Sequence, residues 1–278
     1  MTPTAPSRPV LVGTSWKMNK TLAEAVEFVE SLLAVGVPPS VDAFILPPHT
    51  ALSVVRDRLP QDSRVRLGAQ NAHWASEGAF TGEVSMRMVR DAGASMVEIG
   101  HSERRTAFGE TDEDVSRKVA AALEHDLVPL VCVGESAVVR DAGSAESFVV
   151  AQVRAALAGV AGADSEMILF AYEPYWAIGT GGRAAAPEEV APIMAAIRRA
   201  ATEVLAGSPV RVLYGGSVEE ANALPLLDGA AADGLFVGRA ALSATGFNRL
   251  IALCAGRSTP SAPLSTPIDR EVQHAACR

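Results

Sequence analysis

The sequence lacks an excess of basic residues. Its 278 residues include 24 lysines and arginines against 32 aspartates and glutamates, a formal net charge of −8. Because proteins bind nucleic-acid phosphates through positively charged faces, this balance excludes nucleic acid as the main partner. A small phosphorylated ligand is still allowed, since it needs only one nearby cation and a few oriented N–H groups.

Cysteines and long apolar runs are also scarce. The three cysteines are widely spaced and form no CxxC pair, which indicates reduced thiols rather than a disulfide framework. The start, MTPTAPSRPV, has no apolar signal segment. No later stretch approaches the run of about 20 apolar residues that crosses a membrane. We therefore expect a cytoplasmic protein with no membrane partner.

A glycine fingerprint for dinucleotides is absent too. The first apolar run leads into VGTSWKMNK (Val12–Lys20) rather than GxGxxG, which argues against a doubly wound sheet. Eight short runs, apolar throughout, alternate instead with segments of helical periodicity, and this pattern predicts parallel strands covered by helices. The runs are Val10–Gly13, Ala43–Leu46, Val65–Ala69, Met96–Ile99, Val128–Val133, Met167–Tyr172, Val210–Tyr214 and Leu235–Val237.

Eight strand–helix units in about 250 residues are typical of an α/β fold of the TIM type, a (β/α)8 barrel of eight parallel strands each followed by a helix. We expect residues 8–256 to form this single domain. Proline, serine and small residues are frequent in 1–7 and 257–278, which predicts a flexible N-terminus and a flexible C-terminal tail.

Unusual polar residues follow several of the predicted strands. Lys17 follows the first strand, His101 and Glu103 follow the fourth, and Glu173 follows the sixth. Each alone is explained as a solvated loop residue. In a barrel, however, the active site lies at the C-terminal ends of the strands. Their arrival together at that end favours an active site.

These side chains suit proton abstraction next to a carbonyl group. The aromatic neighbours of Glu173 should desolvate its carboxylate and raise its basicity. His101 can donate a hydrogen bond to an enediolate oxygen, and Lys17 supplies positive charge to that oxyanion or to a phosphate. The small residues of AIGTGG (Ala177–Gly182) predict a mobile lid.

A phosphate site is expected after the seventh and eighth strands. LYGGS (Leu213–Ser217) and VGRAAL (Val237–Leu242) place Ser217 and Gly238 at predicted helix starts, where backbone N–H groups bind anions. Ser217 and Glu220 have the spacing of a capping box, which alone is weak evidence because it is common helix punctuation.

Six motifs in order give the chain a clear resemblance. They are WKMN (16–19), GAQN (68–71), GAFTGE (78–83), GHSERR (100–105), YEPYWAIGTG (172–181) and YGGS (214–217). From about Arg8 to Gly256 the chain resembles the triosephosphate isomerases. The resemblance implies that Glu173 is the base, His101 the electrophile and Lys17 the electrostatic anchor.

The resemblance implies further roles. Glu103 would be a carboxylate near Lys17 that orients groups or moves protons. Gly179, Ser217 and Gly238 would bind the phosphate. The Gly78–Glu83 loop would join two subunits in a homodimer and bring Thr81 near the partner's active site.

The chain departs from the family pattern at several positions. Ser15 replaces an asparagine that contacts the substrate carbonyl, which removes two donors and vacates volume where a further hydroxymethyl group would fit. Arg239 replaces a glycine at a phosphate-binding position, where its side chain either binds phosphate or points outward to a surface carboxylate. The lid reads GTGGRAAAP (179–187) and is one residue longer, and Tyr175 replaces a valine.

The segments GTSWKMNKT, AHW, VEIGHSERR and GLFVGR resemble the erythrulose-phosphate isomerases of erythritol catabolism. That branch interconverts L-erythrulose 1-phosphate and D-erythrulose 4-phosphate. An ordinary triosephosphate isomerase that tolerates Ser15 is the alternative. A barrel that binds sugar phosphates without turnover is a third hypothesis, against which the retained Glu173, His101 and Lys17 argue.

No cofactor is expected, because enolisation needs neither a redox group nor a metal. Four histidines show no metal-ligand spacing, and of these His73 would line the subunit interface if the loop resemblance holds. They are His49, His73, His125 and His274. Glu98, an acid near the end of the fourth strand, either faces the helices or pairs with a basic neighbour.

Overall fold

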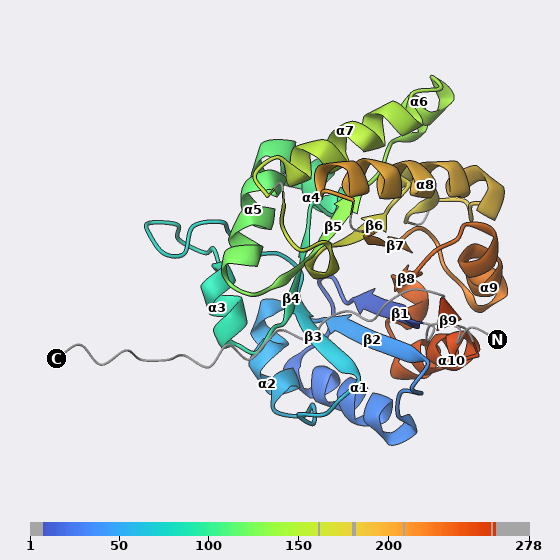
Figure 1. Ribbon diagram of the computed structural model, residues 1–278. Coiled ribbons are helices and arrows are strands. Elements are labelled where there is room, and N and C mark those ends of the chain that lie inside the picture. The colour runs from blue at the N-terminus through green and yellow to red at the C-terminus, as the bar shows by residue number, and fades with distance from the viewer. Residues whose placement is uncertain (1–7, 161, 180–181, 208, 257, 260–278) are drawn as a thin grey trace, which may run out of the picture.

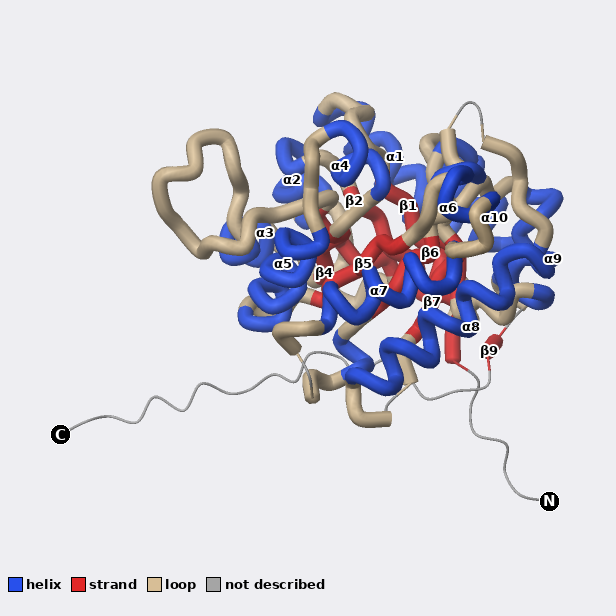
Figure 2. The backbone as a smooth tube through the Cα atoms, turned by 90° about the horizontal axis from the view of Figure 1, so that it is seen from above, coloured by secondary structure: helices blue, strands red, loops and turns tan. Residues whose placement is uncertain are grey.

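The computed structural model describes residues 8–160, 162–179, 182–207, 209–256 and 258–259. Eight parallel strands form a central ring that helices surround (Figures 1 and 2). Each strand pairs with the next, and the first pairs with both the second and the eighth, which closes the ring. The strands are β1 (Arg8–Ser15), β2 (Val41–Leu46), β3 (Val65–Ala69), β4 (Met96–Ile99), β5 (Val128–Val133), β6 (Leu169–Tyr172), β7 (Arg211–Tyr214) and β8 (Gly234–Val237). The predicted (β/α)8 barrel is confirmed.

Helices fill the connections between the strands. The α-helices are α1 (Leu22–Val35), α2 (Leu52–Arg56), α3 (Met86–Asp91), α4 (Ser102–Ala107), α5 (Asp112–Glu124), α6 (Ala137–Asp141), α7 (Ala145–Leu157), α8 (Pro187–Val204), α9 (Glu220–Gly229) and α10 (Ala244–Cys254). In the described part of the chain, four 3-10 helices complete them: η1 (His49–Ala51), η2 (Ser165–Met167), η3 (Tyr175–Ala177) and η4 (Arg239–Ala241).

Local sequence explains where the longer helices begin. Thr21 caps α1, because its backbone N–H donates to Glu24 Oε2 at 2.7 Å and its hydroxyl accepts from the Glu24 N–H. Pro187 opens α8, at a position where the missing N–H costs nothing. The apolar faces of the longer helices, such as α1, α5, α7, α8 and α10, then pack on the outside of the ring.

The inside of the ring is a second apolar layer. It is made of Leu11, Phe44, Leu46, Met96, Val128, Leu130, Cys132, Leu169, Ala171, Leu213 and Phe236. Because side chains alternate along a strand, the residues two positions after Met96 and Ala171 point to the same inner side. Those residues are Glu98 and Glu173. The interior of the ring is therefore polar at the C-terminal ends of the strands and apolar along the rest of its length.

The sheet continues past the expected end of the domain at Gly256. Ser258 and Thr259 form β9, which pairs antiparallel with Pro9 and Arg8 of β1. The expected flexible segments 1–7 and 257–278 otherwise lie outside the described residues. In the described part of the chain, we find no helix that is both long and apolar enough to cross a bilayer.

Candidate active site

Two adjoining cavities lie at the C-terminal ends of the strands. The first, of about 520 Å³, is lined by Gly179, Ser217, Gly238 and Arg239 among others. The second, of about 300 Å³, is lined by Gln70, Glu98, His101 and Glu103 among others. Ser15 and Lys17 line both. The structure therefore brings the predicted phosphate-binding residues to one side of a site and the predicted catalytic residues Lys17, His101 and Glu103 to the other. Glu173 lines neither of these two cavities and reaches the site through its contact with His101.

His101 is held in a defined orientation at the start of α4. Its Nδ1 accepts a hydrogen bond from the Glu103 backbone N–H at 3.1 Å, so a neutral imidazole carries its proton on Nε2. That Nε2 lies 3.2 Å from Glu173 Oε1. The imidazole and the carboxylate are therefore in direct contact, so a hydrogen-bond donor and a candidate base lie side by side.

Glu173 is almost fully buried, with 1% of its surface exposed. The Ser102 backbone N–H donates to its Oε2 at 3.1 Å, and its own N–H donates to the Val133 carbonyl at 2.8 Å. At Gly134 a Cβ atom would lie only 1.9 Å from the Glu173 carbonyl oxygen. The backbone of the candidate base is therefore packed directly against a residue that has to be glycine.

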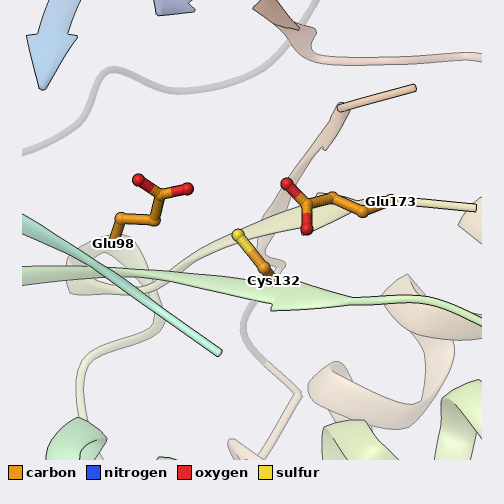
Figure 3. A group of neighbouring side chains, drawn as sticks. All are labelled: Glu98, Cys132 and Glu173. Carbon is orange, nitrogen blue, oxygen red and sulfur yellow. The ribbon is translucent and has the colours of Figure 1, made fainter. Parts of the chain in front are cut away.

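Cys132 lies between the carboxylates of Glu98 and Glu173 (Figure 3), and one ligand atom of each falls within 4.8 Å of the others. Burial and the charge of Glu173 hold the pKa of the Cys132 thiol well above its usual value. Both carboxylates of this trio face His101, whose Nε2 lies 3.2 Å from Glu173 Oε1 and 3.9 Å from Glu98 Oε1.

Glu98 is buried inside the ring, with 2% of its surface exposed. The Ser15 hydroxyl donates to its Oε2 at 2.9 Å, while Oε1 accepts no hydrogen bond from the described residues. Burial raises the pKa of Glu98 to about 7; the charge of His101 opposes the rise and that of Glu173 adds to it. Glu98 therefore faces the interior of the ring, so the alternative that it faces the helices is wrong. The alternative of a basic neighbour fits, since His101 Nε2 lies 3.9 Å from Glu98 Oε1, within ion-pair distance when the imidazole is protonated.

Lys17 has an unusual backbone, with a φ of 53°. Gln70 Nε2 supports it by donating to the carbonyls of Lys17 at 3.0 Å and Leu46 at 2.8 Å. The Lys17 ammonium lies 2.5 Å from Glu103 Oε1, in the proximity that the family resemblance implies. The loop therefore directs the cation over the site at the cost of a strained residue.

A buried ionic network holds the loop that carries His101. Glu110 accepts the Gly100 N–H at 3.0 Å through one oxygen, and Arg104 at 2.5 Å and Lys118 at 3.0 Å through the other. Burial by itself would raise the pKa of Glu110, but the Lys118 and Arg104 contacts outweigh it and lower that pKa. The network joins α5 to the end of β4. The sequence motifs did not predict it.

The phosphate side differs from the prediction in two respects. The capping box predicted at Ser217 is wrong: α9 begins at Glu220 and is capped at Glu219, whose N–H donates to Asn222 Oδ1 at 2.8 Å. The Ser217 N–H donates to the Ala177 carbonyl at 2.9 Å, so it is already engaged. Gly238 caps the short helix η4 rather than an α-helix.

Arg239 is exposed and borders the first cavity. It forms no ion pair with another residue in the described part of the chain. The sequence left open whether the Arg239 side chain binds phosphate or points outward to a surface carboxylate. The second interpretation therefore lacks the carboxylate that it requires. A guanidinium beside Gly238 and Ser217 is available to an anion in the cavity.

The segment after Glu173 is anchored at its first turn. Glu135, 1% exposed, accepts from the Trp176 Nε1–H at 2.7 Å and from the Tyr172 hydroxyl at 3.1 Å. Burial raises the pKa of Glu135. The Trp176 ring also lies 4.6 Å from the Arg183 guanidinium, which pairs with Glu189. Of the expected lid, Thr180 and Gly181 lie outside the described residues.

Thr81 is not part of this site. The loop before α3 extends away from the barrel (Figures 1 and 2), and Thr81 lines a separate cavity of about 410 Å³ with Phe80 and Phe108. Phe108 is 71% exposed, which is high for an aromatic side chain.

Sequence reasoning missed Gln70, Glu110 and Glu135 as supports of the site. Gln70 lies within the motif GAQN, which gave it no separate role, and Glu110 and Glu135 are single polar residues outside the quoted motifs. Glu98 had a stronger signal, a charged residue within an apolar strand.

Comparison with known proteins identifies the family. The sequence model described as triosephosphate isomerase matches residues 10–254. A Mesorhizobium japonicum protein named L-erythrulose-1-phosphate isomerase is 48% identical over 239 residues, 85% of this chain and 93% of that protein. A protein of the same name from Mycolicibacterium smegmatis is 48% identical over 248 residues, 88% and 92% of the two chains. One from Rhizobium etli is 44% identical over 266 residues, 95% and 99%. The chain is an isomerase of the triosephosphate isomerase family.

Proposed function

We propose that the protein interconverts L-erythrulose 1-phosphate and D-erythrulose 4-phosphate without a cofactor. The observation that carries the chemistry is the 3.2 Å approach of His101 Nε2 to Glu173 Oε1. A base and a hydrogen-bond donor that lie side by side suit the removal of a proton next to a carbonyl. The relatives named L-erythrulose-1-phosphate isomerase support the choice of substrate.

In the proposed reaction, Glu173 removes the proton from the carbon that carries a hydroxyl beside the carbonyl. The electron pair moves to the carbonyl oxygen and leaves an enediolate across the two carbons. His101 Nε2–H and the Lys17 ammonium stabilise that oxyanion. Glu173 then returns the proton to the former carbonyl carbon, and the hydroxyl proton moves between the two oxygens. The carbonyl has moved by one carbon, with no net gain of atoms or electrons.

The phosphate would occupy the first cavity. Gly179, with a φ of 80°, lets the backbone approach an anion closely, and Gly238 and Ser217 border the same space. Arg239 would add a positive charge that pairs with two phosphate oxygens. Phosphate at this end would set the reacting carbons beside Lys17, His101 and Glu173.

The test compares kcat/KM for L-erythrulose 1-phosphate and glyceraldehyde 3-phosphate under one set of conditions. We expect a preference for the tetrulose of at least about tenfold, since one extra carbon group is worth about 1–3 kcal/mol of discrimination. Faster triose turnover would assign the protein to the alternative, a triosephosphate isomerase.

A Glu173→Gln variant separates an enzyme from a binding protein. The variant should lose turnover by about a thousandfold or more while it keeps its affinity for a sugar phosphate. If the parent never turned over either substrate but bound both, the non-catalytic hypothesis would replace this one.

We further propose a homodimer through the Gly78–Glu83 loop, with Thr81 near the partner's active site, in the cytoplasm. The exposed Phe80 and Phe108 around Thr81 support the interface, and the buried, free thiols of Cys132 and Cys254 support the compartment. Sedimentation velocity should give a dimer for the parent. Thr81→Arg should give monomers, whereas Thr245→Arg, at an exposed threonine of α10, should not. A monomeric parent would overturn this proposal.

A further inference from the structure

We propose that Glu98 and Ser15 bind the terminal hydroxyl of the substrate and so select a four-carbon over a three-carbon sugar phosphate. The inference rests on the proposed function and deepens it by assigning the side chain that recognises the additional hydroxymethyl group. Glu98 lies in the segment VEIGHSERR, but the resemblance assigns it no role and the expected catalytic set does not contain it.

Glu98 lies where the end of the substrate chain would be. Ser15 and Lys17 are shared by the two cavities, so they mark the place where the cavities meet. With phosphate in the first cavity and the reacting carbons beside His101, the carbon beyond them enters the second cavity. Glu98 lines that cavity. Its Oε2 is 2.9 Å from the Ser15 hydroxyl, so the pair lies where the substrate chain would end.

Glu98 also has an unmet hydrogen bond. Glu98 Oε1 is buried and accepts no hydrogen bond from the described residues, and the His101 Nε2 is too far, at 3.9 Å. Buried polar atoms without partners are rare and unfavourable. A primary hydroxyl both donates and accepts, so it satisfies Glu98 whether that carboxyl is charged or protonated.

The Glu98 carboxylate also lacks the structural role that Glu110 has. The described lysine and arginine side chains form no ion pair with Glu98, in contrast to Glu110, which is held by Lys118 and Arg104. A carboxylate kept inside a largely apolar ring at such a cost has to be useful there. Recognition of a substrate hydroxyl is a use that its geometry supports.

The test is a cycle between the side chain and the substrate hydroxyl. The substrates are L-erythrulose 1-phosphate and its analogue with a methyl in place of the terminal hydroxymethyl group. The proteins are the parent, Glu98→Leu and Glu98→Gln. We expect the parent's ratio of kcat/KM for the two substrates to fall about 10- to 100-fold in Glu98→Leu. Glu98→Gln, which keeps an acceptor of the same shape, should retain most of the ratio.

A ratio that is the same in Glu98→Leu as in the parent would overturn the inference, because a purely structural role would slow both substrates alike. If the leucine variant does not fold, binding replaces turnover. The parent and Ser15→Ala would then be compared for erythritol 4-phosphate against glycerol 3-phosphate. A preference of the parent for the four-carbon ligand that Ser15→Ala reduces supports the inference, and equal affinities in the parent overturn it.

The proposed function fails in a different way. If the parent shows no turnover of L-erythrulose 1-phosphate, the substrate is wrong, and this inference falls with it. If the parent does turn over the tetrulose but its preference is insensitive to Glu98, only the assignment of the subsite is wrong.

Discussion

Gln70 fixes the backbone of Lys17 by donating from one Nε2 to the carbonyl of Lys17 at 3.0 Å and to that of Leu46 at 2.8 Å. The amide thereby joins the end of β2 to the loop after β1. A lysine with a φ of 53° depends on such support, because this backbone region is unfavourable for residues with a side chain.

Replacing Gln70 with methionine should therefore lower activity more than stability. We expect kcat/KM to fall by about 10- to 100-fold as Lys17 loses its fixed position, and unfolding free energy to fall by about 1–2 kcal/mol. Steady-state kinetics and urea unfolding measure the two effects. Asn248→Met, which removes a hydrogen bond to the Ser31 carbonyl far from the site, is the control. Equal activity in Gln70→Met and the parent would show that Lys17 holds its position unaided.

The pH dependence of stability should reveal Glu98. Its pKa rises from 4.5 to about 7 in the folded protein, so the native state keeps a proton that the unfolded state has already lost. The stabilisation is fully present below pH 4.5 and is lost as the pH rises through 7. Glu98→Gln has no carboxyl to titrate, so its stability does not fall in this way. Between pH 4 and pH 8, the unfolding free energy of the variant relative to that of the parent should rise by about 3 kcal/mol. Parallel unfolding curves at all pH values would show that Glu98 titrates normally.

The Glu110 network should be strongly stabilising as a unit. Glu110→Ala leaves Lys118 buried and uncompensated, and we expect a loss of about 3–5 kcal/mol in unfolding free energy. The double variant Glu110→Leu with Lys118→Met should recover much of it, since both charges are then gone. Chemical denaturation of the single and double variants measures the coupling. If the double variant lost as much unfolding free energy as Glu110→Leu and Lys118→Met lose together as single variants, the result would contradict the pairing.

Two neighbouring interactions, the hydrogen bond from Trp176 to buried Glu135 and the exposed ion pair of Arg183, should differ in their effect on stability. Trp176→Phe removes the donor to buried Glu135 and should cost about 1–3 kcal/mol of stability. Arg183→Ala removes an exposed ion pair with Glu189 and should cost less than about 1 kcal/mol. Differential scanning calorimetry distinguishes them. Arg140 also lies over this ring, at 4.4 Å. An effect of Arg183→Ala as large as that of Trp176→Phe would mean that the contacts of Arg183, rather than Glu135, stabilise this turn.

The strands were predictable because their residues carry the pattern of a parallel sheet. All eight predicted runs overlap observed strands, and β3, β4 and β5 have the predicted bounds. Apolar residues that face both the ring interior and the helices leave a continuous signal in sequence.

The helix start after β7 was less predictable, because capping depends on where the chain leaves the strand. Ser217 and Glu220 had the right spacing, yet Asn222 supplies the cap at Glu219 and also donates to the Ser217 carbonyl at 3.0 Å. Local spacing alone does not distinguish these two solutions.

The candidate site also has features that the sequence predicts and features that it does not. Motif order placed Lys17, His101 and Glu173 at one end of the barrel. The direction of Glu98 follows from the inward face of Met96 two residues earlier, but which face of β4 is inward is decided by packing across the ring. The hydrogen bond to Ser15 joins residues 83 positions apart in the chain, and no local pattern reports such a contact.

The contact of Gly134 with the Glu173 backbone has a consequence for variation in this protein. Gly134 has no reactive group, yet even one methyl group there would displace the backbone of Glu173 and so misalign the base. Substitutions of Gly134 should therefore inactivate the protein while it remains folded. A mutational survey that considers only reactive side chains as functional would misread this loss of activity as damage to the fold.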